Sequence, residues 1–136
     1  KIKKFLIATS NLDAKVFKIK KSTISDFEII SKSIEFVKSR FKIHYKGLNQ
    51  ISIRLHPSEH KNKYIKFIKK NNLKGLKIEN NTNILNALNK YFAVIGCETT
   101  LLVLAKLSGL KTYNIFMNNS KYRKLPKKYF DSYLKI

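Results

Sequence analysis

Five short segments rich in apolar residues are predicted to be β-strands. They lie at 3–10, 51–55, 76–79, 92–95 and 111–116. The first contains the continuous apolar run FLIA, which is typical of a strand buried on both faces of a parallel sheet. We therefore expect this strand to be covered by helices on either side.

Between these strands, apolar residues recur every three or four positions and predict amphipathic helices. The clearest helix begins at Ser25, which can form a capping box with Glu28, and its apolar stripe continues to Phe41. Shorter helices are predicted at 58–71 with Ser58 as its cap, after the Asn80-Asn81-Thr82 turn, and from about 98 to 108.

Strands that alternate with helices predict parallel pairing through right-handed crossovers. The expected fold class is therefore α/β, a three-layer Rossmann-like sandwich with about five parallel strands. Residues 1–120 would form this domain. Residues 121–136 form a basic C-terminal amphipathic segment, which we expect to end in a final helix.

Polar residues follow two of the predicted strands. The first group is His56, Pro57 and Ser58, and the second is Gly96, Glu98, Thr99 and Thr100. Ligands of open parallel sheets bind beyond the carboxyl ends of the strands. A glycine allows the chain to turn close to a ligand, and threonine hydroxyls at a helix N-terminus can bind an anion. The sequence therefore predicts an anion site between the two loops.

Each of these residues also has an ordinary structural explanation. A His before Pro is common at the end of a strand, and Thr99 and Thr100 could simply cap their helix. Glu98 is electrostatically favourable near a helix N-terminus without any ligand. These explanations, taken separately, do not account for the gathering of polar residues at one edge of the sheet.

The net charge of +21 comes from 29 Lys and Arg against 8 Asp and Glu, and only Arg40, Arg54 and Arg123 are arginines, leaving 29 − 3 = 26 lysines. Such an excess fits a solvated lysine surface, a phosphate-rich partner or an anionic membrane. The sequence has no Cys/His cluster with metal-ligand spacing, so we expect no metal site. No apolar run reaches the roughly 18 residues of a membrane span.

Two motifs resemble the nucleotide-binding half of GT-B glycosyltransferases, and more narrowly the bacterial sialyltransferases and polysialyltransferases. They are His56-Pro57 within IRLHPSE and Thr99-Thr100 within VIGCETTLLVLAKLSGLKT. The resemblance covers about 50–116. It implies that residues 1–120 bind a nucleotide-sugar donor, a cytidine monophosphate (CMP) sugar, with no further cofactor.

The resemblance also assigns roles to individual residues. His56 would neutralise charge on the departing phosphate, while Thr99 and Thr100 would hydrogen-bond it. Asn80, Asn81 and Thr82 would lie near the base and ribose. The acceptor would be a glycan, as in surface polysaccharide or lipooligosaccharide synthesis on the cytoplasmic side of a bacterial membrane.

In this family the acidic general base belongs to an N-terminal domain, and the sequence has no matching acidic motif. The chain begins with Lys1. We therefore expect it to be one half of a longer enzyme and to be inactive alone.

Three alternatives remain open from the sequence. The same architecture serves CDP-glycerol-type and other capsule transferases. The lysine excess alone fits a polyanion-binding module, although the chain lacks the interleaved aromatic and Arg motifs of nucleic-acid readers, which disfavours nucleic acid. The basic segment 121–136 could contact an anionic membrane, a partner domain or the domain's own core.

Overall fold

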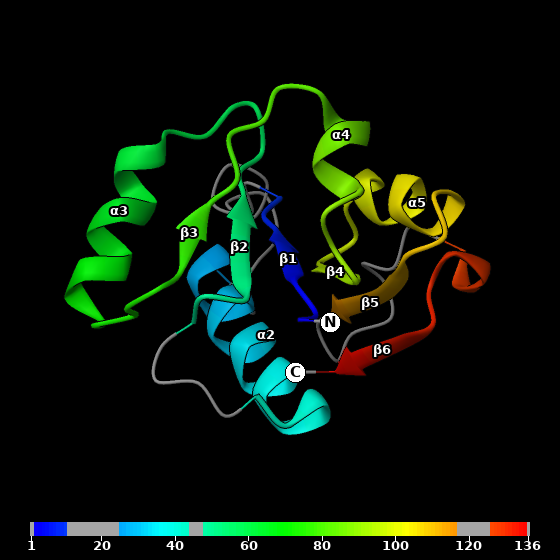
Figure 1. Ribbon diagram of the computed structural model, residues 1–136, viewed down its shortest axis with the longest axis horizontal. Coiled ribbons are helices and arrows are strands. Elements are labelled where there is room, and N and C mark those ends of the chain that lie inside the picture. The colour runs from blue at the N-terminus through cyan, green and yellow to red at the C-terminus, as the bar shows by residue number, and fades with distance from the viewer. Residues whose placement is uncertain (1, 11–24, 44–47, 117–125, 136) are drawn as a thin grey trace, which may run out of the picture.

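The computed structural model describes residues 2–10, 25–43, 48–116 and 126–135. Its centre is a single parallel sheet of six strands in the order β3-β2-β1-β4-β5-β6 (Figure 1). The strands are β1 (Phe5–Ala8), β2 (Ile51–Arg54), β3 (Lys77–Ile78), β4 (Ala93–Gly96), β5 (Lys111–Phe116) and β6 (Ser132–Lys135).

Helices cover both faces of this sheet. They are α2 (Asp26–Phe41), α3 (Lys61–Lys70), α4 (Ile84–Leu88), α5 (Thr100–Leu107) and the short 3₁₀ helix η2 (Lys127–Tyr129). Side chains of α2 and α3 pack into one core, and side chains of α4 and α5 pack into the other. The predicted three-layer α/β sandwich is confirmed.

The central strand β1 divides the two cores, as its apolar run predicts. Phe5 and Ile7 point into the core beneath α2 and α3, whereas Leu6 and Ala8 point into the core beneath α4 and α5. All four are buried. Alternate side chains of a strand lie on opposite faces, so a strand covered on both sides must be apolar throughout.

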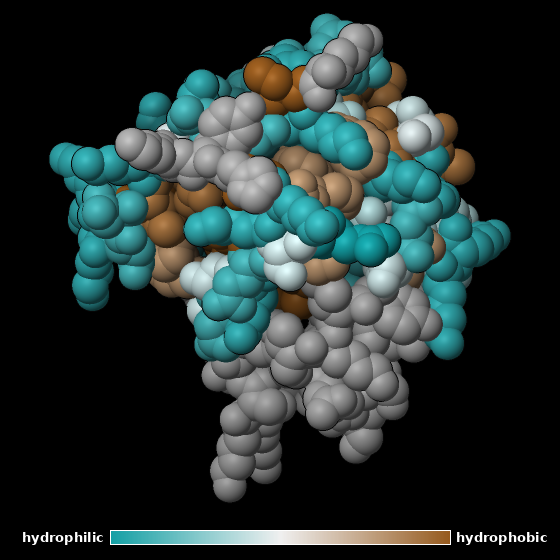
Figure 2. Space-filling view, turned by 60° about the horizontal axis from the view of Figure 1, so that its bottom comes forward, coloured by the Kyte–Doolittle hydropathy of each residue, from teal (hydrophilic) through white to brown (hydrophobic). Residues whose placement is uncertain are grey.

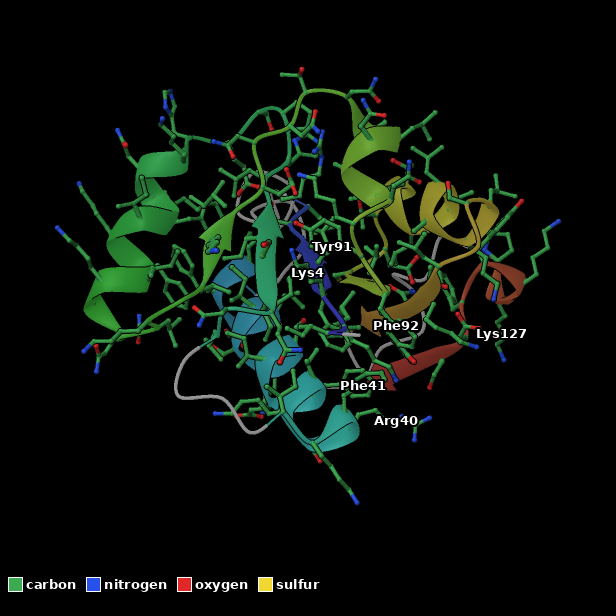
Figure 3. The ribbon with its side chains drawn as sticks, in the orientation of Figure 1. Lys4, Arg40, Phe41, Tyr91, Phe92 and Lys127 are labelled. Atoms are coloured by element: carbon green, nitrogen blue, oxygen red, sulfur yellow. The ribbon has the colours of Figure 1, made fainter. Side chains whose placement is uncertain are left out.

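An aromatic cluster closes the amino ends of the central strands. The ring of Phe41, near the end of α2, lies 4.8 Å from Phe5 and 5.7 Å from Phe92 between ring centroids. Figure 3 shows Phe41 and Phe92 close together below the sheet. This end of the sheet is packed with aromatic side chains, and the opposite, carboxyl end is where the chain forms cavities.

One predicted helix start is wrong. The helix expected at 58–71 is α3 and begins only at Lys61, after a turn in which the His56 carbonyl accepts from the Glu59 N–H at 2.9 Å. His60 occupies the cap position without a side-chain cap bond, so Ser58 is not the cap. The helix α4 begins after the Asn80-Asn81-Thr82 turn, as predicted; its cap is Asn83, whose side chain accepts from the Asn86 N–H at 3.2 Å.

The predicted final helix is also wrong. Residues 126–135 form η2 and then β6, which pairs in parallel with the outer edge of β5. Asp131 fixes this pairing: its N–H donates to the Thr112 carbonyl at 2.8 Å, and its carboxylate accepts from the Thr112 N–H at 2.7 Å. The rest of the predicted basic segment, 121–125, lies outside the described residues.

Lysine side chains dominate the exposed surface of the described residues. In the coloured part of Figure 2, hydrophilic residues predominate, with smaller apolar areas between them. Lys66, Lys69 and Lys70 of α3 are all exposed. Among the helices of the described ranges, none has the length and apolar character needed to cross a bilayer.

Two leucines of α5 test the packing described for the core beneath α4 and α5. Leu102 is 0% exposed and Leu107 is 73% exposed. Leu102→Ala should lower the free energy of unfolding by about 2–5 kcal/mol because it leaves a cavity. Leu107→Ala, the same change on the same helix, should alter it by at most about 0.5 kcal/mol. Chemical denaturation measures both, and equal losses would contradict the described packing.

Candidate functional site

The two loops singled out by the sequence meet at the carboxyl end of the sheet. A cavity of about 310 Å³ is lined there by His56 and Pro57 from one loop and by Thr99 and Thr100 from the other. Ala8 and Thr9, at the end of β1, also line it. The structure therefore brings His56 and the two threonines around one small space.

A larger cavity of about 830 Å³ adjoins the first and shares Arg54, Leu55, His56 and Pro57 with it. Asn80, Asn81 and Thr82 line this second cavity together with residues from the start of α3. The three polar residues predicted to face a base and ribose thus share a cavity with His56. We refer to the two adjoining cavities together as the cleft, the smaller being its narrow part and the larger its wide part.

The imidazole of His56 is held in one orientation by Ser58. Its Nδ1 accepts from the Ser58 backbone N–H at 3.2 Å, and the Ser58 hydroxyl lies 2.6 Å from the same nitrogen. Because a backbone N–H can only donate, Nδ1 must be the acceptor, and the proton of a neutral ring is then on Nε2. Ser58 lines neither cavity in the described structure; its position orients His56 instead.

Arg54 is a cleft residue that the sequence reasoning missed. It is the last residue of β2, it lines both cavities, and one Nη donates to the Asn81 carbonyl at 2.7 Å. Ile51 and Ile53 of the same strand are buried in the core beneath α2 and α3, so Arg54 projects to the opposite face. The alternation of apolar and polar residues along β2, with an arginine two residues before the His-Pro pair, could have indicated that Arg54 lies near the cleft.

Gly96 allows the second loop to approach the end of β1. A Cβ at this position would lie 2.6 Å from Thr99 Cγ2 and 3.3 Å from the Ala8 carbonyl oxygen. Thr99 is the N-cap of α5, and its hydroxyl accepts from the Leu101 N–H at 3.4 Å. Thr100 is exposed, and in the described part of the chain its hydroxyl has no hydrogen-bond partner. Both hydroxyls keep a proton to donate, and Thr100 is the more exposed of the two.

The prediction that Glu98 binds phosphate is not supported by its position. Glu98 adopts the left-handed conformation, with φ of 49°, and it lines neither cavity as described. Its backbone N–H donates to Asn114 Oδ1 at 2.8 Å, and its carboxylate accepts from Asn114 Nδ2 at 2.9 Å. β5 lies beside β4, so Asn114 can anchor the turn that precedes α5.

Two buried glutamates, Glu59 and Glu79, line the wide part of the cleft. Neither was singled out from the sequence. The Glu59 side chain is 1% exposed and that of Glu79 is 7% exposed. Glu59 accepts from the hydroxyls of Thr9 and Tyr64, from Lys63 at 3.1 Å and from the His56 N–H at 3.1 Å. Both carboxylates are occupied by protein donors.

Glu79 makes the same kinds of bonds on the other side of the cleft. It accepts from the Tyr91 hydroxyl at 2.6 Å, from Lys90 at 3.1 Å and from the Asn81 N–H at 3.1 Å. Burial would raise the pKa of each glutamate, but these hydrogen bonds outweigh burial and lower the pKa below its ordinary value. Both are therefore anionic at neutral pH.

Because protein donors engage both carboxylates, the groups left to contact a ligand are cationic or neutral. Within the described ranges, no group of three or more His, Cys, Asp or Glu side chains could hold a metal ion. The cleft offers the Arg54 guanidinium, the His56 imidazole, Lys61 and the N-terminus of α5. This set suits an anion.

Comparison with family models, curated proteins and solved structures finds no match to this chain.

The lowered pKa values of Glu59 and Glu79 predict acid sensitivity. A carboxylate whose folded pKa lies below the ordinary 4.5 stabilises the fold above that pH, and this contribution is lost as the pH falls through the folded pKa. The free energy of unfolding should therefore decline below about pH 4.5 in the wild type. A Glu59→Gln, Glu79→Gln variant, which lacks these titrations, should show a shallower decline in acid denaturation. Parallel slopes would contradict the prediction.

Proposed function

We propose that this chain is the donor-binding half of an inverting, sialyltransferase-like glycosyltransferase that uses a CMP-activated sugar. One observation carries the proposal: Arg54, His56, Thr99 and Thr100, from separate segments of the chain, line a single cavity of about 310 Å³. That cavity would receive the phosphate of the donor.

The arrangement suits a departing phosphate. When the bond between sugar and phosphate breaks, the phosphate changes from a singly charged diester to a monoester that carries more negative charge. The Arg54 guanidinium and the His56 Nε2–H would stabilise this added charge, and Thr100 with the N-terminus of α5 would add hydrogen bonds. Donors fixed before the reaction stabilise developing charge without reorganisation.

The wide part of the cleft is suited to the nucleoside. Its apolar wall includes Ile65 and Ile78, and its polar lining includes Asn80, Asn81 and Thr82. An apolar wall can pack against a flat base, and amide and hydroxyl groups can donate to or accept from its edge and the ribose. The wide and narrow parts adjoin at His56, as a base joined to a phosphate through a ribose requires.

The described residues of the cleft do not supply a free general base for the acceptor. Among the described residues that line the cleft, the carboxylates are Glu59 and Glu79, and both are engaged by protein donors. A base would therefore come from a second domain facing the cleft. We expect this chain to bind donor nucleotides without transferring the sugar.

Titration with CMP, followed by NMR, tests the proposal. CMP should shift the resonances of Arg54, His56 and Thr100, and uridine monophosphate should bind more weakly. His56→Ala should weaken CMP binding by about 1.5–3 kcal/mol, the scale of a hydrogen bond that involves charge.

Lys70→Ala is the control, because Lys70 is an exposed residue of α3 that lines neither part of the cleft. It should bind CMP as the wild type does. If millimolar CMP leaves the cleft resonances unchanged, or if Lys70→Ala loses as much affinity as His56→Ala, the proposed donor site is wrong.

A further inference from the structure

Two buried glutamates in this domain make matching sets of hydrogen bonds. Glu59 follows β2 and Glu79 follows β3, two neighbouring strands of the sheet. Each accepts from a tyrosine hydroxyl, from a lysine ammonium and from a backbone N–H. The same arrangement therefore occurs twice, once on each side of the wide cavity.

The backbone N–H groups link these glutamates to the cationic side of the cleft. Glu59 accepts from the N–H of His56 itself, at 3.1 Å. Glu79 accepts from the N–H of Asn81 at 3.1 Å, and the carbonyl of Asn81 accepts from the Arg54 guanidinium at 2.7 Å. Glu59 thus fixes the backbone of His56. Glu79 fixes Asn81, which in turn binds the guanidinium of Arg54.

Thr9 strengthens the first of these links. Its hydroxyl donates to Glu59 and accepts from the His56 N–H at 3.0 Å. Thr9 follows β1 directly, so the His-Pro loop is tied to the central strand. In this position the Ser58 N–H reaches Nδ1 of His56 and leaves Nε2 to donate outward.

Neither glutamate is placed to act on a ligand directly. Their side chains are 1% and 7% exposed; Glu59 accepts from four protein donors and Glu79 from three. Their lowered pKa values have the same cause, because these donors stabilise the ionised form. Ionised carboxylates accept stronger hydrogen bonds than neutral groups, which suits them to fixing a loop.

We propose that Glu59 and Glu79 are paired positioning residues for the anion site: Glu59 fixes the imidazole of His56, and Glu79 fixes the guanidinium of Arg54 through Asn81. The inference rests on the proposed function insofar as the anion is the phosphate of a nucleotide. It adds that each of these two side chains has its own buried carboxylate, so the two links act separately.

A double-mutant cycle tests this pairing. Affinities for CMP and for inorganic phosphate are measured by calorimetry or NMR for Glu59→Gln, Glu79→Gln, Arg54→Gln and His56→Ala, singly and in pairs. Glutamine keeps the shape of glutamate but replaces one acceptor oxygen with an NH₂ donor that faces other donors. The matched control is Glu35→Gln, which makes the same change in charge at a side chain that is 72% exposed on α2.

Each glutamine variant should weaken CMP binding by about tenfold, the lower end of the loss that follows removal of a partner that orients a ligand-binding side chain. In a variant that already lacks Arg54, Glu79→Gln should weaken CMP binding little further. In a variant that lacks His56, Glu79→Gln should weaken it by the full tenfold. Glu59→Gln should show the opposite pattern. Glu35→Gln should bind as the wild type does.

A second measurement needs no ligand. The ¹⁵N shifts of the His56 ring should report the Nε2-protonated form in the wild type and a mixture of tautomers in Glu59→Gln. The Nε–H signal of Arg54 should broaden or shift in Glu79→Gln and stay unchanged in Glu59→Gln. Purely structural glutamates would give neither of these residue-specific changes.

The outcomes separate this inference from the proposed function. If the ring and guanidinium signals respond as expected but CMP does not bind, the positioning is supported and the donor assignment fails. If CMP binds but both glutamates couple equally to Arg54 and His56, or to neither, the paired positioning is wrong. Should a glutamine variant not fold, Tyr64→Phe and Tyr91→Phe remove one donor from each glutamate and give the same pattern in milder form.

Discussion

The parallel pairing of β1 with both β2 and β4 fixes where polar groups can gather in this protein. In the register, Ala8 pairs with Arg54 on one side and with Gly96 on the other. Arg54 and Gly96 therefore lie two strand spacings apart, roughly 9 to 10 Å, across the smallest side chain of β1. The loops that follow them meet beyond the end of β1. The small side chain of Ala8 leaves space between these loops, and Ala8 lines the narrow cavity.

The electrostatics of the cleft depend on burial more than on net charge. The chain carries a charge of +21, yet most of its lysines are solvated and screened over about 8–10 Å. At the cleft, the carboxylates of Glu59 and Glu79 are buried and hydrogen-bonded by protein donors. Under the proposed function, the few basic groups that remain there would act on an anion in a partly desolvated setting, where each charge interacts more strongly. The general lysine excess would then attract an anion from a distance, and the cleft would select it.

The sequence pattern was sufficient for the first five strands of the sheet and for part of the cleft. The last predicted strand, Lys111–Phe116, has the observed bounds, and β1 is buried on both faces as its apolar run indicated. His56, Thr99 and Thr100 could be found because strand ends in parallel sheets share one edge. These predictions depend on local periodicity and on a general rule of topology.

What the pattern did not reveal depends on contacts between distant segments. Asp131 binds the backbone of Thr112, and this pairing turned a segment with helix-like spacing into β6. Glu59 and Glu79 looked like ordinary loop residues, because the bond from Thr9 to Glu59 and the bond from Tyr91 to Glu79 join separate elements of the fold. Arg54 was hidden among the charged residues, since its orientation follows from which face of β2 the core occupies.

The short length of β3 has a consequence for how copies of this protein behave toward one another. An edge strand exposes unpaired backbone groups and can recruit a strand from another molecule. β3 spans only Lys77–Ile78, and Lys77 is exposed beside the lysines of α3. A second copy approaching this edge would meet like charge and find too few backbone partners to form a ladder, so the domain resists aggregation along its β3 edge.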